Sequence, residues 1–207
     1  MPDKIVADYQ VPAESVEVEE IIKNSQFITR IKNVSTAQAA KDFIKALNTT
    51  YPEATHHCWA YIVGDPKSTT LIGCSDDGEP SGTAGKPMLN VLQHSGIGDI
   101  VAVCTRFYGG TKLGTGGLSR AYGGGVKLAL ESLELKDKID FTALEFQLAY
   151  AQLKDCEHLL KDYQIEDLNI EYGESIQVTL KVATLQLKQL KLSLDDKFKG
   201  EFEWTIV

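Results

Sequence analysis

Residues 100–133 read IVAVCTRFYGGTKLGTGGLSRAYGGGVKLALESL, and this stretch decides the fold of the first half of the chain. Its first eight residues are almost entirely apolar, which is typical of a buried strand. From Leu118 to Leu133, apolar residues recur at helical spacing and predict an amphipathic helix. A strand, a glycine-rich loop and a helix therefore follow one another here.

The flanking sequence predicts the other elements of a first α+β domain. Ser35 or Thr36 can cap a helix that runs to about Asn48, because apolar residues recur at helical spacing after it. A second helix begins among small residues, with a proline in its first turn. The ranges are strands at 16–34 (two pieces divided near 23–25), 57–63 and 69–74, and helices at 36–48 and 82–95.

The segment after a charged connector, 134–140, predicts a second domain. It contains strands at 141–148, 165–172, 176–183 and 202–207, and a helix at 152–163. Residues 185–194 fit either a strand or a helix. We favour a helix, because βαββαβ is a closed ferredoxin-like unit. The predicted fold class is α+β with two domains, 1–134 and 135–207.

The glycines and the charges are unevenly distributed. The chain has 207 residues and 17 glycines, of which 14 lie between Gly73 and Gly125. The formal net charge is −8, which argues against a bulk-basic nucleic-acid coat protein. The segment 86–127 nevertheless carries five basic residues against one acid, a net charge of +4. Because steering depends on the local field, a local anion-binding surface remains compatible with the acidic total.

Neither a metal nor a membrane is indicated. The four cysteines form no CxxC motif, so no zinc knuckle is predicted. No apolar run approaches the length of a membrane span, and the first residues lack the apolar segment of a signal peptide. We therefore expect a cytoplasmic protein with free thiols, no cofactor, no metal and no membrane partner.

The glycine-rich segment is the main candidate binding site. Glycines let a loop turn sharply and present bare N–H groups, and a helix N-terminus favours an anion. Walker A spacing runs from Gly109 to Gly114 but lacks its lysine, and Ser119 replaces the third glycine of the dinucleotide motif. The candidate anion or nucleic-acid ligands are Lys86, Arg106, Tyr108, Gly109, Gly110, Lys112, Gly114, Thr115, Gly116, Gly117, Arg120, Gly123, Gly124 and Lys127.

Two interpretations remain open for the helix that follows this loop. Arg120, Gly123, Gly124 and Lys127 share one helical face, where two cations flank a patch without side chains. Either another element of the fold packs closely over Gly123–Gly125, or a phosphate backbone or a partner chain approaches there.

An acidic turn supplies weaker, catalytic candidates. Asp76, Asp77 and Glu79 precede a helix start, and together with His57 they could perform acid–base chemistry or bind a metal. The alternative is a simple Asp-Gly turn, with Ser81 or Thr83 capping the helix. Strand alternation places His56 and His57 on opposite faces, which argues against a shared metal.

Four sequence motifs resemble the YigZ/IMPACT family: HHCWAY (56–61), the SDDGEP lead-in, GEPSGTAGKPML (78–89) and RFYGGTKLGTGGLSRAYGGG (106–125). The resemblance implies an N-terminal domain similar to the second domain of a small-subunit ribosomal protein and to a domain of elongation factor G. It also implies a C-terminal domain similar to a ferredoxin-like domain of that factor, and nucleic-acid or ribosome binding. Eukaryotic members regulate translation through a partner reached by an additional N-terminal domain, so that specific role is not transferred.

Three functional hypotheses follow. The first is a non-enzymatic, translation-linked regulator that binds RNA or the ribosome through the basic glycine-rich loop and helix. The second is a hydrolase acting on a phosphorylated small molecule or nucleic acid, which requires a cavity where the glycine loop and the acidic turn converge. The third is a protein-binding regulatory module, with a translation-related protein as its partner.

Overall fold

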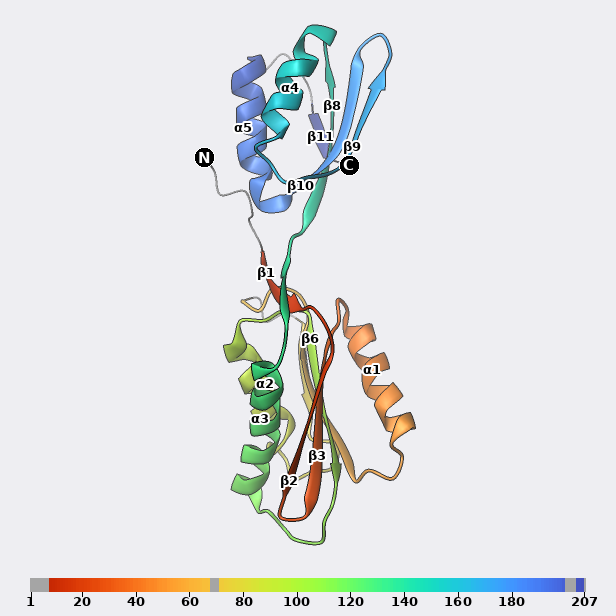
Figure 1. Cartoon of the computed structure of the whole chain (residues 1–207), viewed down its shortest axis with the longest axis vertical. Helices are drawn as coiled ribbons and strands as arrows, with labels where there is room; N and C mark the ends of the chain where they lie inside the picture. Colours follow the sequence, from red (N-terminus) through yellow and green to blue (C-terminus); the bar gives the residue numbers. More distant parts are fainter. Residues whose placement is uncertain (1–7, 68–70, 200–203, 207) are drawn as a thin grey trace. The chain divides into compact units, whose positions relative to one another are not determined.

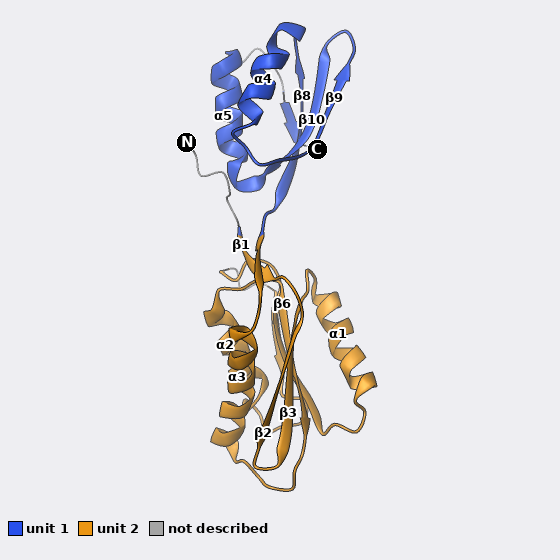
Figure 2. Ribbon diagram, in the orientation of Figure 1, with its two compact units in different colours: residues 1–8, 138–207 blue, residues 9–137 orange. Residues whose placement is uncertain are grey.

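The computed structural model describes residues 8–67, 71–199 and 204–206. The chain divides into two compact units (Figure 2). We call Tyr9–Asp137 the first unit (orange, labelled unit 2 in Figure 2). The second unit begins at Lys138 and also contains Asp8 (blue, labelled unit 1 in Figure 2). Both units combine helices with a β-sheet, so the predicted two-domain α+β architecture is confirmed.

A five-stranded antiparallel sheet forms the centre of the first unit. Its most buried strand, β6, is the one that the sequence indicated most clearly. Residues 69 and 70 of the predicted strand 69–74 lie outside the described residues. In sheet order the strands are β2 (Val16–Ile22), β3 (Ser25–Asn33), β6 (Ile100–Phe107), β4 (His56–Ile62) and β5 (Ile72–Ser75).

Helices cover both faces of this sheet (Figure 1). The α1 helix (Ala37–Thr50) lies on one face, and α2 (Gly85–Ser95) and α3 (Thr115–Glu131) lie on the other. Successive side chains of β6 point alternately to the two faces of the sheet. Cys104 belongs to the core under α2 and α3, whereas Val103 belongs to the core under α1. Arg106 follows Cys104 by two residues and therefore lies on the α2/α3 face.

One small element was not predicted. β1 (Tyr9–Pro12) and β7 (Leu135–Lys138) form a two-stranded sheet, although the sequence suggested a connector at 134–140. The β7 sequence, LKDK, has no alternating apolar pattern. Its strand conformation depends on pairing with β1, more than 120 residues away in the sequence. The local pattern of apolar residues gives no sign of such a distant partner.

The second unit has the predicted βαββαβ order. Its sheet order is β11-β8-β10-β9, and α5 confirms the helix favoured for 185–194. Its core consists of apolar side chains from the helices and from one face of the sheet. Residues 202, 203 and 207 of the predicted last strand lie outside the described residues. The elements are β8 (Phe141–Leu148), α4 (Leu153–Leu160), β9 (Ile165–Tyr172), β10 (Ile176–Ala183), α5 (Leu187–Phe198) and β11 (Trp204–Ile206).

Candidate functional site

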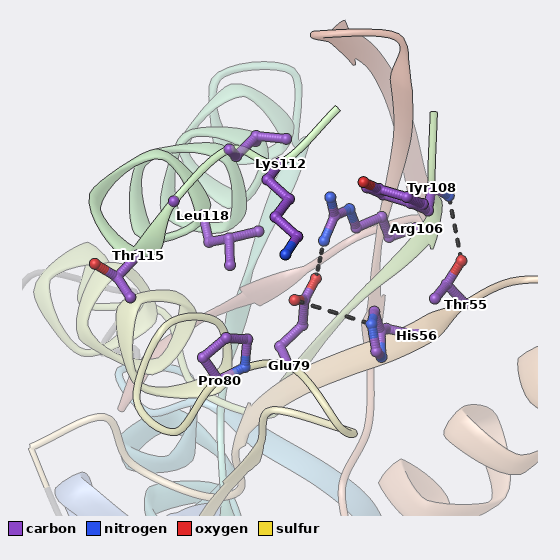
Figure 3. A pocket seen from close by; sticks show the side chains of 11 residues that line it. Thr55, His56, Glu79, Pro80, Arg106, Tyr108, Lys112, Thr115 and Leu118 are labelled. Atoms are coloured by element: carbon purple, nitrogen blue, oxygen red, sulfur yellow. Dashed lines mark hydrogen bonds and ion pairs between the residues drawn. The ribbon is translucent and has the colours of Figure 1, made fainter. Parts of the chain in front are cut away.

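A cavity of about 500 Å3 opens where the glycine loop meets the acidic turn. Glu79 and Pro80 line it from the acidic turn, Arg106 and Tyr108 from the end of β6, and residues 112–115 from the loop and the start of α3 (Figure 3). The two segments that the sequence singled out therefore converge, as the hydrolase hypothesis required. The volume lies within the range of small-molecule sites.

A buried ion pair forms the floor of this cavity. Arg106 donates from Nη1 to Oε1 of Glu79, and both side chains are about 95% buried. The hydroxyl of Tyr122 donates to the same Oε1 at 2.7 Å, and Arg106 Nη2 donates to Ser25 Oγ at 3.3 Å. Because Arg106 is neutralised by Glu79, it is not the exposed phosphate contact that its place in the basic segment suggested.

Around this pair, exposed groups form the rim. Tyr108 is 46% exposed, and the Arg106 guanidinium carbon lies 5.4 Å from the centroid of its ring. Lys112 is exposed and extends into the cavity (Figure 3). The rim therefore offers an aromatic face and a cation to a ligand.

His56 faces the second oxygen of Glu79. Its Nε2 lies 3.9 Å from Glu79 Oε2, which is too long for a hydrogen bond. Its Nδ1 lies 2.7 Å from the carbonyl oxygen of Asp77, which can only accept, so Nδ1 carries the proton. The lone pair of a neutral His56 imidazole is then on Nε2. The sequence indicated His57 as the candidate, but His56 is the histidine that lines the cavity.

The glycine loop is held against the β2–β3 hairpin. A Cβ on Gly109 would lie 1.9 Å from the carbonyl oxygen of Asn24, so only glycine fits there. Its N–H donates to Ser25 Oγ at 3.1 Å and is not free for a ligand. Gly114 has φ 76° and is the N-cap of α3, where no side chain caps the helix. The first amides of α3, on Thr115, Gly116 and Gly117, therefore have no intrahelical partner.

A second hollow of about 220 Å3 lies on the other side of Leu113, which lines both cavities. It is lined by Lys23, Gly117 and Arg120. Lys23 and Asn24 both have positive φ, and their tight turn carries Lys23 to the first turns of α3. Lys23 was not among the sequence candidates; the split between the two predicted strands near residue 23 was the available signal.

The glycine face of α3 is mostly occupied by the fold itself. Gly123 packs against Pro87 and Val91 of α2, and a Cβ on Gly125 would lie 2.5 Å from Thr29 Oγ1 of β3. Gly124 alone has open space at its Cβ position. Close packing therefore explains Gly125, whereas a Cβ at position 123 would make only ordinary van der Waals contacts. Arg120, Gly124 and Lys127 are exposed on one face.

Two predicted ligands lie apart from this region. Gly110, with φ 82°, is exposed in the loop but lines neither hollow. Lys86 is exposed near Cys74 of β5, where its charge lowers the pKa of that thiol, although burial raises it more. Lys86 lines neither hollow.

Asp76 has a structural role. Its Oδ1 accepts from the amides of Ala84 and Gly85 at 2.9 and 2.8 Å, and its Oδ2 accepts from Gly82 at 2.7 Å. Burial opposes ionisation, but these three donors prevail and hold the pKa of Asp76 below its ordinary value. The expected Ser81 or Thr83 cap is wrong, since Asp76 caps α2 across the turn.

The other two weak catalytic candidates also belong to the scaffold. Asp77 Oδ2 accepts from the His57 amide at 2.6 Å. The His57 ring is buried on the α1 face, where Nε2 contacts the Tyr51 carbonyl at 3.1 Å and Nδ1 contacts Thr105 Oγ1 at 3.2 Å. The structure thus leaves Glu79 in the cavity and separates it from Asp76, Asp77 and His57.

The comparisons with known proteins support one family. The family model for the Impact N-terminal domain matches residues 23–130, more than half of the chain. A Haemophilus influenzae IMPACT family member is 41% identical over 94% of this chain and 95% of its own length. The Escherichia coli member YigZ is 40% identical over 93% and 95%. The chain belongs to the IMPACT family.

A solved structure supports the two-domain α+β fold. The crystal structure of a hypothetical protein superposes with a TM-score of 0.70 at 38% identity and covers 98% of both chains. The Bacillus subtilis family member YvyE is 38% identical over 82% of this chain and 77% of its own length. In this IMPACT family member, the region matched by the family model contains all residues that line the main cavity.

The thiols and the buried phenol offer no ready nucleophile. Burial raises the pKa of Cys104 to about 12 and also raises those of Cys58 and Tyr122 well above their ordinary values. In the described part of the chain, no three metal-ligating side chains come together. Every helix within the described ranges is too short or too polar to cross a membrane.

Proposed function

We propose that this IMPACT family member is a translation-linked regulator that binds single-stranded RNA, free or on the ribosome. The observation that carries the proposal is the group of exposed cations around the uncapped N-terminus of α3. Lys23, Lys112 and Arg120 surround amides that have no intrahelical partner. An RNA strand supplies anions that suit both the cations and the helix dipole.

The exposed aromatic ring favours nucleic acid over an isolated anion. Bases of single strands stack on aromatic side chains, with little dependence on sequence. Tyr108 lies beside the cations, and Arg106 supports its ring. Family membership is compatible with this proposal, because the family resemblance implies nucleic-acid or ribosome binding. The proposal places the protein in the cytoplasm with these partners.

Charge reversal tests the proposed surface. We expect the RNA strand to continue from Arg120 along the exposed face of α3 that also carries Lys127. The variant Arg120→Glu/Lys127→Glu should therefore bind a single-stranded RNA more weakly than the wild type, because it inverts two cations on that path. The slope of log K against log salt should flatten by about 1.4, since each single-strand phosphate contact contributes about 0.7. Fluorescence anisotropy at several salt concentrations measures both quantities.

Lys154→Glu/Lys188→Glu is the matched control. Both lysines are exposed on helices of the second unit, and the change in net charge is the same. This variant should keep the affinity and the salt slope of the wild type, apart from a small uniform effect of net charge. Equal losses in the two variants would show that RNA binding does not depend on α3, and no RNA binding by the wild type would refute the proposal.

The cavity also favours a second candidate, a hydrolase for phosphorylated molecules or nucleic acid. The specific observation is the His56 imidazole facing the Glu79 carboxylate beside Lys112. An imidazole with its other nitrogen held by a carbonyl can serve as a general base. Incubation of the protein with phosphorylated nucleotides and RNA, followed by product analysis, tests this activity. Turnover that disappears in His56→Phe would support it, and an absence of turnover would refute it.

A further inference from the structure

The strongest unexplained feature of the cavity is a pair of acceptors without donors. Glu79 is 91% buried and uses Oε1 for both Arg106 and Tyr122. Among the described residues, no donor lies within hydrogen-bond distance of its Oε2, which faces Nε2 of His56 at 3.9 Å. An oxygen that lines an open cavity and has no donor from the protein can accept a hydrogen bond from a donating group of a ligand.

The geometry points to a ligand with two adjacent hydroxyl groups. Because the Asp77 carbonyl only accepts, a neutral His56 ring carries its proton on Nδ1, and its Nε2 is then an acceptor like Glu79 Oε2. Two acceptors 3.9 Å apart can each receive an O–H bond of about 2.7 Å from neighbouring oxygens. The 2′,3′-diol of a terminal ribose presents two such donors side by side.

The rest of the cavity fits the remainder of a nucleotide. The Tyr108 ring offers a stacking face, and Lys112 and the N-terminus of α3 at Thr115 offer an anion site. The phosphate is expected at Lys112 and Thr115, because the Glu79 carboxylate would repel it. A cavity of about 500 Å3 is large enough for a group of this size.

We propose that this cavity binds a ribonucleotide with a free 2′,3′-diol, as found at the 3′ end of an RNA. This inference rests on the proposed RNA binding, because it assigns the end of the strand to the cavity and the adjoining phosphates to the cations of α3. Glu79 and His56 accept from the two hydroxyls, and Tyr108 stacks on the terminal base. A free ribonucleoside 5′-phosphate carries the same chemistry and would occupy the same place.

Matched oligonucleotides test the inference on the unaltered protein. Four single-stranded RNAs of about ten nucleotides, a length within the range of single-strand binding sites, should differ only at the 3′ terminus: 2′,3′-diol, 2′-deoxy, 2′,3′-dideoxy and 3′-phosphate. We expect the diol to bind about tenfold or more tightly than the dideoxy end, since hydrogen bonds to a charged group are the strong ones. The 2′-deoxy end should lie between them.

Competition with adenosine 5′-monophosphate and its 2′,3′-dideoxy analogue identifies the source of the diol. If both RNA and the mononucleotide show the diol preference, the cavity inference and the proposed RNA binding both hold. If RNA binds with equal affinity whatever its end, the inference fails and the proposed function stands. If only the mononucleotide binds with diol preference, the cavity inference holds and the proposed RNA function fails.

A protein variant locates the diol. His56→Phe removes the Nε2 acceptor, so the tenfold preference for the diol over the dideoxy end should fall to about threefold. His158→Phe, at an exposed helical position of the second unit, is the control and should keep the full preference. A full preference in folded His56→Phe would overturn the assignment to this cavity.

Discussion

The two units of the chain differ in what they bury. Among the described residues, ten polar or charged side chains are buried. Nine of them, including Arg30, Glu79 and Arg106, lie in the unit from Tyr9 to Asp137, and the tenth, Gln186, lies in the other unit. Buried charge is costly unless it is paired, and it is often retained where a protein needs a defined site. The comparison therefore favours the first unit as the place of the proposed site, whereas the described core of the second unit is almost entirely apolar.

The ion pairs of the second unit are exposed, unlike the buried pair of the first unit. Lys181 and Asp167 lie 2.6 Å apart, and Lys197 and Asp155 lie 3.5 Å apart, but all four side chains are about half exposed. The sheet face opposite the helices carries polar side chains such as Glu145, Gln147, Gln177, Thr179 and Lys181. In the described part of the strands, this face is therefore mainly polar, unlike the aromatic platform with which some other four-stranded sheets bind RNA.

The largest change in stability is expected in the first unit, when one partner of the buried Glu79–Arg106 pair is removed. Glu79→Ala leaves the Arg106 charge buried and uncompensated, and should lower the free energy of unfolding of the first unit by about 3–5 kcal/mol. Each unit contains one of the two tryptophans, so urea unfolding followed by Trp59 fluorescence in a Trp204→Phe background reports on the first unit.

Glu79→Leu/Arg106→Leu is the informative control for that experiment. It removes both charges and should recover much of the loss, because apolar replacement of a whole buried pair is often neutral. A change below about 1 kcal/mol in Glu79→Ala would contradict the view that this pair is buried and essential to the first unit.

Alanine substitutions at Gly109 and Gly124 should change the stability of the first unit in opposite directions. Gly109→Ala places a Cβ against the Asn24 carbonyl and should destabilise the first unit by about 1–3 kcal/mol. Gly124→Ala enters open space within α3 and should stabilise it by up to about 1 kcal/mol. Thermal unfolding of both variants measures the difference. A loss of stability in Gly124→Ala would show a close neighbour that the structure does not place there.

Asp76 should make the first unit sensitive to acid. Because the folded-state pKa of Asp76 is lowered, its stabilising contribution is present above the ordinary Asp value of about 3.9 and is lost as the pH falls through the lower folded-state value. Asp76→Ala should cost about 1–2 kcal/mol at pH 7, the value of a helix cap. The difference from wild type should shrink between pH 4 and pH 2, measured by urea unfolding; a constant difference would assign the effect to packing rather than charge.

The smallest effect is expected in the second unit. Lys181→Ala removes a short but exposed ion pair, and the melting temperature should not change measurably at physiological salt. Differential scanning calorimetry at low and high salt provides the measurement. A clear decrease that salt abolishes would show that surface pairs stabilise the second unit more than the comparison implies.

Sequence patterns predicted the elements better than the site. The strand at Ile100–Phe107 and the helix after it were recognisable because their apolar periodicity is local. The ion pair of Glu79 and Arg106 was not recognisable from the sequence. Both residues were candidates, but a single sequence gives no sign that two positions 27 apart are in contact. Strand alternation correctly separated His56 from His57, but it could not say which one faces a cavity.

The same limit explains the missed cation and the misassigned cap. Lys23 reaches α3 because a hairpin turn carries it there, and Asp76 caps α2 from eight residues before Ala84. Both relations depend on how separate segments pack. Residue type and short-range spacing indicated segments that line the cavity, and tertiary contacts decide which of their side chains face it.

The contact between Gly109 and Asn24 has a consequence for how this protein can vary. Because the Asn24 carbonyl occupies the place of a side chain at position 109, the length of the β2–β3 turn and the residue at 109 are not independent. A shortened or lengthened turn would release that constraint and also displace Lys23 and the loop that borders the cavity. Evolution or engineering of this hairpin should therefore proceed by paired changes, with a substitution at 109 tolerated only alongside a remodelled turn.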